Sequence, residues 1–459
     1  MVFIIVLLTF FIFALAIMWR PSTVLAFAVC IYPFEQWAQA NMAYFAQNSA
    51  IINYGLGLLT LFALACVMMR GQNPLNPTTN AMWVWLALYI YAGLSCLWAL
   101  DRETSLFLYK YHAPYVITFV ALLPLVIQKP DDVRTGLIAT LTFGTFVMIL
   151  LAFDTGIHAW GRTIEVEHGI GVVDRVGQSR TRLAPLSVAE TAGQLIIIAT
   201  LMNFIGLNRV WQIARWVVVF IALALIYRSG SRGQFFAAAI AVMIFIAPSR
   251  GLLKARGWVT ASASIAVMLA VSAFTFTAFA DTSGRWSLER MSDTLQATRI
   301  DYCITLLNFW ADSSPIHWLF GIGSSSSYDP RILGIYCHVV VVEILAELGI
   351  VGFCMITAFV LLVCRDGYQL YKATKGSNVD RGTAVALCGL FLFQLILTFK
   401  ERSFLSHTFT LSVGLMICRY CAVVKSQKKR ERSMAMRRWA LQQTQLQQQQ
   451  AARPLAHTH

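Results

Sequence analysis

The chain has 459 residues, of which 58% are hydrophobic and 13% are charged, and its formal net charge is +14 at pH 7. Apolar runs of the roughly 20 residues that a membrane-spanning helix needs recur along the chain, which excludes a soluble globular domain. Because the lysines and arginines collect in loops on one predicted side, membrane topology and anionic inner-leaflet lipid explain the basic balance, and we expect no nucleic-acid partner.

The N-terminal run is apolar and is followed by Trp19-Arg20-Pro21. It lacks the basic start and the small-residue cleavage site of a signal peptide, so we expect a retained first span. The runs along the chain predict twelve transmembrane helices, or thirteen if the short run 22–34 also crosses. The candidate spans are residues 2–18, 22–34, 51–69, 81–99, 111–128, 135–153, 187–207, 212–228, 233–249, 258–279, 339–364, 381–399 and 404–422.

The basic segment from Lys425 to Arg438 predicts a cytoplasmic C-terminus. Alternation backwards from that end places loops 35–50, 100–110, 154–186, 280–338 and 400–403 outside the cytoplasm. We therefore expect a single all-α polytopic transmembrane domain over residues 1–423 with a large extracytoplasmic loop at 280–338. Residues 424–459 are expected to form a basic, then Gln-rich cytoplasmic tail that is disordered or a frayed helix.

The position of the ionisable residues distinguishes between classes of membrane protein. Transporters place such groups near the bilayer midplane. Here they gather at the predicted outer ends of spans, as Asp101, Arg228, Arg232, Lys400 and Arg402 do. This pattern indicates a site at the outer interface for a lipid with a charged head group, rather than a pathway across the membrane.

Arginines stand at several of these outer positions. The segment Arg228-Ser-Gly-Ser-Arg232-Gly joins two spans, and Gly230 and Gly233 permit a tight turn with positive φ. Two guanidiniums held this close could bind a phosphate by bidentate hydrogen bonds, or they could extend to lipid head groups. Further arginines precede a span or lie in the long loop, and these are Arg180, Arg182, Arg285, Arg290 and Arg299.

Arg299 begins an amphipathic stretch to Trp310, in which Ile300, Ile304 and Leu307 recur at helical spacing. This stretch predicts a helix that lies against the membrane or the bundle. The turn Gly321-Ile-Gly323-Ser-Ser-Ser-Ser327 offers backbone N–H groups that could meet an oxyanion. Cys303 and Cys337 lie within the loop, and a disulfide between them is compatible with an extracytoplasmic position.

His338 begins the apolar run that continues to Cys364. A helix N-terminus and nearby arginines both disfavour the imidazolium, so we expect a neutral imidazole that can act as a general base. Glu343 and Glu347 lie four residues apart on one helical face that excludes His338. We expect these two carboxylates to form buried hydrogen bonds or to pair with arginines.

In this order and spacing, the elements resemble the bacterial O-antigen ligase and O-antigen polymerase superfamily. The matching elements are Arg182 ahead of a span, the Ser231-Arg232-Gly233 turn, Arg299 before an amphipathic helix, and Gly321-Ile-Gly323 followed by His338 and Glu343-Ile-Leu-Ala-Glu-Leu-Gly349. They cover roughly residues 180–352, and the likeness to lipopolysaccharide O-antigen ligases is the closest within this superfamily.

The resemblance implies a helical membrane fold of the GT-C glycosyltransferase kind in the bacterial inner membrane, with its active site facing the periplasm. The implied donor is a glycan linked to undecaprenyl pyrophosphate, and the implied acceptor is a sugar hydroxyl of lipid A–core. By this likeness His338 would be the general base. The residues implied to hold the pyrophosphate are Arg182, Arg228, Arg232 and Arg299, with Arg180, Arg285 and Arg290 as substitutes.

Arginines can neutralise a departing pyrophosphate, and the first outer loop offers only Glu35 as an acidic residue. We therefore expect no metal and no other cofactor, and direct attack on the anomeric carbon would invert its configuration. The same residues leave open an O-antigen polymerase or a protein O-glycosyltransferase. A transporter of lipid-linked glycans is a further alternative, and it predicts that function survives His338→Ala.

Overall fold

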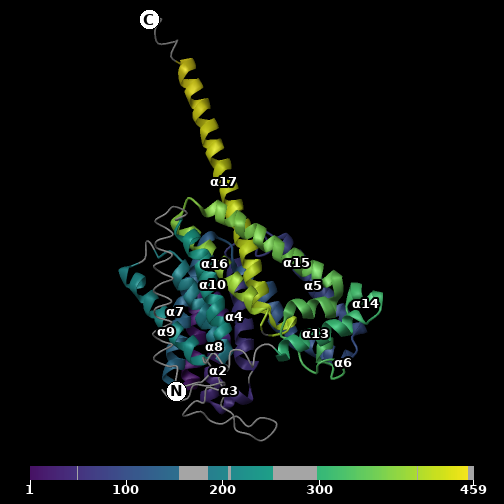
Figure 1. Ribbon diagram of the computed structural model, residues 1–459. Coiled ribbons are helices and arrows are strands. Elements are labelled where there is room, and N and C mark those ends of the chain that lie inside the picture. Colours follow the sequence, from purple (N-terminus) through teal and green to yellow (C-terminus); the bar gives the residue numbers. More distant parts are fainter. Residues whose placement is uncertain (49, 155–184, 205–207, 252–296, 401, 453–459) are drawn as a thin grey trace, which may run out of the picture.

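Figure 1 shows the computed structural model of the chain, which describes residues 1–48, 50–154, 185–204, 208–251, 297–400 and 402–452. All regular elements within these ranges are helical. The predicted span 258–279 and the arginines Arg180, Arg182, Arg285 and Arg290 lie outside the described residues.

The described helices and short helical turns follow one another with few intervening residues. In the first part of the chain they are α1 Val2–Trp19, η1 Pro21–Thr23, α2 Val24–Asn41, α3 Ala43–Gln47, α4 Ala50–Met69, α5 Asn80–Ser95, η2 Cys96–Trp98, α6 Arg102–Tyr115, η3 Val116–Leu122, η4 Leu123–Val126 and α7 Pro130–Asp154. They continue as α8 Pro185–Leu201, α9 Arg209–Ser229, α10 Arg232–Arg250, α13 Ala297–Ala311, α14 Pro315–Phe320, η5 Ser326–Tyr328, α15 Val340–Thr374, α16 Asn378–Leu397, η6 Phe404–Ser406 and α17 Thr408–Ala452.

Ten helical segments in the described ranges are long and apolar enough to cross a bilayer, and α8 is a shorter apolar helix. The prediction of an all-helical, multi-pass membrane protein is therefore confirmed for the described residues. A bilayer tolerates only backbones that satisfy their own hydrogen bonds, which is why the apolar runs fold as helices.

The predicted outer loop 35–50 is wrong at its beginning, because α2 continues through Pro33 to Asn41. Glu35 lies inside this helix and is buried. Its carboxylate accepts hydrogen bonds from the side-chain amides of Gln39 at 2.9 Å and Asn53 at 3.1 Å. Because its hydrogen bonds offset the cost of burial, the Glu35 carboxylate can lie inside a helix. Hydropathy does not show which side chains will form such hydrogen bonds, so the sequence placed a loop there.

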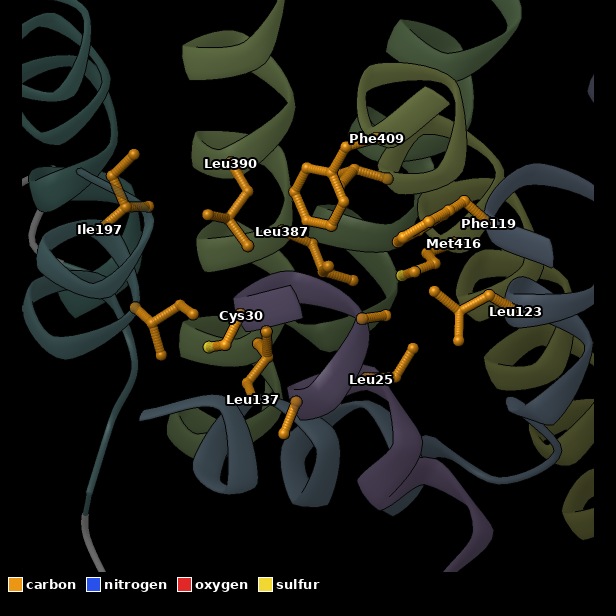
Figure 2. Packing of buried hydrophobic residues seen from close by; sticks show 14 of the residues in the cluster. Leu25, Cys30, Phe119, Leu123, Leu137, Ile197, Leu387, Leu390, Phe409 and Met416 are labelled. Carbon is orange, nitrogen blue, oxygen red and sulfur yellow. The ribbon is translucent and has the colours of Figure 1, made fainter. Parts of the chain in front are cut away.

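α8 is the central helix of the bundle, and each residue from Val188 to Leu201 is buried. It packs against α9, α10 and α16. In Figure 2, Ile197 of α8 lies beside Leu390 of α16, and Leu25, Cys30 and other apolar side chains gather beneath them. Small residues allow the close approach, since Gly193 lies against Phe393 and Gly389 against Leu201.

α15 contains a break that matters for the site. Gly349 has a φ of 67° and divides this 35-residue helix into a short first part and a long second part. α17 carries the basic residues of the C-terminal segment away from the bundle at the top of Figure 1, whereas α6 and α13 lie lower in the view. The Gln-rich part of the tail is helical as far as Ala452.

Candidate active site

His338 lies in the turn that precedes α15, with a φ of 67°. Positive φ is uncommon for a residue with a side chain, and such positions cluster at functional sites. The imidazole is half-buried and lies near two tyrosine rings. The Tyr336 ring lies 4.2 Å away between centroids, and the Tyr302 ring lies 6.2 Å away and nearly parallel to the imidazole.

This environment keeps the imidazole uncharged at neutral pH. Burial lowers the pKa of His338 from its ordinary value of 6.5, and the positive charge of Arg299 lowers that pKa further. A neutral imidazole has a free lone pair, so it can accept a proton from a hydroxyl group. The expected general-base state is thus compatible with the position of His338, and burial is its main cause.

Arg299 reaches the neighbourhood of His338 because α13 forms as predicted, from Ala297 to Ala311. Tyr302 and Cys303 follow Arg299 by three and four residues, so both lie on the same side of the helix as Arg299. Tyr302 contacts His338, and Cys303 contacts Cys337. By contrast, Ile300 and Ile304 are exposed, so their regular spacing does not mark the face that packs on the protein.

The Gly-Ser turn does bind an oxyanion, but that oxyanion belongs to the protein itself. The Glu347 carboxylate accepts hydrogen bonds from the Ser325 N–H at 2.6 Å, the Ser327 N–H at 3.0 Å and the Ser327 hydroxyl at 2.7 Å. Glu343 in turn accepts from the Phe404 N–H at 2.8 Å. These two buried carboxylates therefore stabilise neighbouring loops by hydrogen bonds. This is the first of the two roles expected for them from the sequence, the other being pairing with arginines.

Gly321 and Gly349 allow this turn to lie directly on the broken helix. Both have positive φ, and a Cβ on Gly321 would clash with the backbone carbonyl of Glu347. The break leaves the Leu348 carbonyl in need of a donor. The Tyr91 hydroxyl lies 3.0 Å from this carbonyl and 2.8 Å from the Phe320 carbonyl at the end of α14, so its one proton is shared between these two acceptors. The Gly321-Ile-Gly323 sequence is thus a packing motif that fixes the loop before His338.

Tyr336 also lines a cavity of about 350 Å³. Its wall is polar and aromatic and combines five tyrosines, one histidine, one arginine and four hydroxyl residues. These are Tyr32, Tyr111, Tyr115, Tyr328, Tyr336, His112, Arg402, Ser187, Ser403, Ser406 and Thr408. Because Tyr336 lines the cavity and also contacts the imidazole, His338 lies one ring away from this cavity.

Arg402 is the cation in the described wall of this cavity, and sequence reasoning did not select it as a site residue. Its φ is 68°, and its Nη2 donates to a Glu190 carboxylate oxygen at 2.5 Å. The guanidinium also lies 5.8 Å from the centre of the Tyr32 ring. The buried Glu190 of α8 therefore orients Arg402 toward the cavity, and this contact between distant segments left no signal in the sequence.

The Arg228-to-Arg232 turn is tight, as predicted, since Gly230 has a φ of 65° between α9 and α10. Gly233 has a different role from the one predicted, because it lies within α10 and makes room for the side chain of Lys400. The Ser231 hydroxyl lies 3.5 Å from the carbonyl of Pro185, where α8 begins. The turn thus meets the start of α8 and the loop that carries Lys400 and Arg402.

The structure describes three of the arginines that the sequence predicts to bind pyrophosphate, and these three lie in two separate places. Arg299 lies near His338, whereas Arg228 and Arg232 lie at the turn beside Lys400. Within the described residues, none of these three lines the cavity, and Arg402 does. Arg180, Arg182, Arg285 and Arg290 lie outside the residues that the structure describes.

The arrangement joins a neutral base to a polar, aromatic cavity with a cation in its wall. In the described part of the chain, His, Cys, Asp and Glu side chains form no group of three that could hold a metal ion. No family model and no curated protein matches this chain.

Proposed function

We propose that this protein is an O-antigen ligase of the bacterial inner membrane. It transfers a glycan from undecaprenyl pyrophosphate to a sugar hydroxyl of lipid A–core on the periplasmic face, within a GT-C-like bundle of twelve or thirteen spans. The observation that carries the proposal is the uncharged His338, held one tyrosine ring away from a cavity of about 350 Å³ that Arg402 lines.

In this mechanism His338 accepts the proton of the acceptor hydroxyl while the oxygen of that hydroxyl attacks the anomeric carbon of the donor. The bond from that carbon to the phosphate oxygen breaks, and undecaprenyl pyrophosphate leaves with the bonding electrons. His338 later releases the proton to water. A base is useful here because a sugar hydroxyl is a weak nucleophile until its proton is removed.

The departing pyrophosphate gains negative charge in the transition state, so cations near it lower the barrier. Arg402 in the cavity wall is one cation that could stabilise the departing pyrophosphate. Lys400 lies two residues before Arg402 and packs beside the turn that carries Arg232. The tyrosines can pack their ring faces on sugar rings and offer hydroxyls for hydrogen bonds. Donor binding in the cavity would thus place the donor one tyrosine ring from the base.

The test is transfer by purified protein in a lipid bilayer, with lipid-linked donor and lipid A–core acceptor. His338→Ala is expected to abolish transfer because the base is lost, whereas donor binding is expected to persist. His317→Ala is the matched control, since His317 lies on the neighbouring helix α14 and is expected to leave transfer unchanged. Transfer by His338→Ala at the wild-type rate would falsify the base assignment.

The same assay decides between the related activities. Lipid A–core, a second lipid-linked repeat unit and a protein acceptor can be offered in parallel. We expect glycan on lipid A–core, whereas product on the repeat unit alone would make this chain a polymerase, and product on the protein alone would make it a protein O-glycosyltransferase. Donor movement across the bilayer that survives His338→Ala would instead indicate a transporter.

Metal independence is tested in the same preparation. We expect the transfer rate to be unchanged after incubation with EDTA, because the described charges near the leaving group come from arginine and lysine side chains. Loss of transfer that returns on addition of a divalent cation would contradict this expectation.

A further inference from the structure

Two thiols meet directly beside the candidate base. The Sγ atoms of Cys303 and Cys337 lie 3.5 Å apart, and both cysteines are free in the structure. Cys303 belongs to α13 and is half-buried, whereas Cys337 is fully buried in the turn before α15. Both residues lie outside the segments long enough to cross the membrane.

A disulfide has an S–S bond of about 2.05 Å, so these sulfurs need to approach by roughly 1.5 Å. Rotation about χ1 moves each sulfur without moving the backbone. The 34 positions that separate the residues in sequence make their contact a product of the fold, since no local turn brings them together.

The region around the two thiols has a small core of its own. Its buried apolar residues are Leu306, Ile322, Ile332, Cys337 and Ala346, and they form a cluster separate from the main core of the bundle. A cluster of this size provides little stabilisation, and natural proteins often supplement such cores with covalent links. Cys303 packs on this cluster, so a bond to Cys337 would join α13 to it.

Neighbouring residues connect this link to the site. Tyr302, which stacks on the imidazole, directly precedes Cys303, and Cys337 directly precedes His338. Arg299 lies one turn before Cys303 on the same helix. A covalent bond here would therefore hold the base, its stacking partner and its neighbouring cation at constant separation.

We propose that Cys303 and Cys337 form a disulfide that holds α13 against the turn carrying His338. The inference rests on the proposed function for its periplasmic, oxidising compartment. The oxidant required is a protein disulfide of the thiol-oxidase class. Cys303, the more accessible thiol, attacks that disulfide as a thiolate and forms a mixed disulfide.

The Cys337 thiolate then attacks the Cys303 sulfur, the S–S bond between the two cysteines forms, and the oxidant leaves as a dithiol. Two thiol protons are released to acceptors, and two electrons pass from the cysteine pair to the oxidant, so the exchange is balanced. Burial raises the pKa of the Cys337 thiol, so a smaller share of it is thiolate, the form that attacks a disulfide.

The first measurement is direct detection of the bond. Membranes are denatured in the presence of N-ethylmaleimide so that buried free thiols also react, and the purified chain is digested without reductant and analysed by mass spectrometry. We expect a cross-linked peptide pair containing Cys303 and Cys337 in the wild type. The same pair should be present in Cys354→Ser, a matched variant at an exposed cysteine of α15, and absent from Cys303→Ser. Maleimide on both thiols of the wild type would overturn the proposal.

The second measurement concerns the consequence for the site. Reductant is expected to lower the melting temperature and to slow glycan transfer several-fold in the wild type and in Cys354→Ser. It should have no effect on the Cys303→Ser, Cys337→Ser double variant, which should already resemble the reduced wild type. Equal melting temperatures and rates for oxidised and reduced wild type would overturn the holding role.

The two measurements separate this inference from the proposed function. A cross-linked peptide pair in a protein that transfers no glycan in any variant would retain the disulfide and reject the ligase. Free thiols in a protein that ligates normally would reject the disulfide and retain the ligase.

Discussion

At the residue scale, the central feature is the environment that keeps His338 neutral. The imidazole is half-buried beside Tyr336 and is influenced by Arg299, and both effects disfavour its charged form. The pKa of this candidate base is therefore lowered from 6.5, which favours the unprotonated form at pH 7. Position rather than residue type makes this histidine a candidate base.

This environment predicts the pH dependence of transfer. The rate should rise with pH as His338 loses its proton and should level off above its lowered pKa. Arg299→Ala removes a positive charge, so the pKa of His338 should rise and the acidic limb of the kcat/KM profile should move to higher pH. Arg331→Ala, which removes an exposed charge paired with Asp329, is the control and should not move the limb. An unshifted limb in Arg299→Ala would argue against an electrostatic influence of Arg299.

The second prediction at this scale is that Arg402 contributes to donor binding. A hydrogen bond to a charged group contributes roughly 1.5–3 kcal/mol, so Arg402→Ala should weaken donor binding by about tenfold or more. Since this change also leaves the buried Glu190 without its charged partner, the double variant Arg402→Gln, Glu190→Gln serves as the reference. Titration with the lipid-linked donor measures the affinity, and wild-type affinity in the double variant would exclude Arg402 from donor binding.

At the element scale, the break in α15 positions the site. Gly349 interrupts the helix, the Gly-Ser turn fills the space beside it, and Glu347 satisfies the N–H groups of that turn. The loop that reaches His338 thus begins from a rigid support. Glu343 extends the same support to η6, and Ser406 of η6 and its N-cap residue Ser403 line the cavity.

The packing of this turn is tested by Gly321→Ala. The new Cβ would clash with the Glu347 carbonyl at a position with positive φ, so we expect a loss of roughly 1–3 kcal/mol of stability. Gly376→Ala is the control, because nothing lies within 4 Å of a Cβ there. Thermal unfolding in detergent should show a lower melting temperature for the first variant only. Equal melting temperatures would mean that the turn is not under this constraint.

At the scale of the whole molecule, the basic tail and the candidate site are expected on opposite sides of the membrane. Lys110 of α6 and Lys429 of α17 are both exposed and provide native markers for the two sides. In intact spheroplasts, a membrane-impermeant amine reagent should modify Lys110 but reach Lys429 only after permeabilisation. The reverse pattern would place the site in the cytoplasm and remove the basis for a periplasmic ligase.

The sequence by itself determined the helical membrane class and the approximate limits of most spans. Hydropathy suffices for this because lipid leaves an apolar chain no alternative to the helix. The sequence also singled out His338 and the helix of Arg299, since a polar loop with regularly spaced apolar residues is conspicuous in an apolar chain.

Only the tertiary structure decided which groups meet. It extended α2 past Glu35, assigned the Gly-Ser turn to Glu347, placed Arg402 in the cavity wall and brought Cys303 to Cys337. Each of these features depends on side chains that are far apart in the sequence, and no regular spacing in the sequence connects them. Hydrogen bonding and packing between such segments depend on three-dimensional proximity, which is why one-dimensional spacing does not contain them.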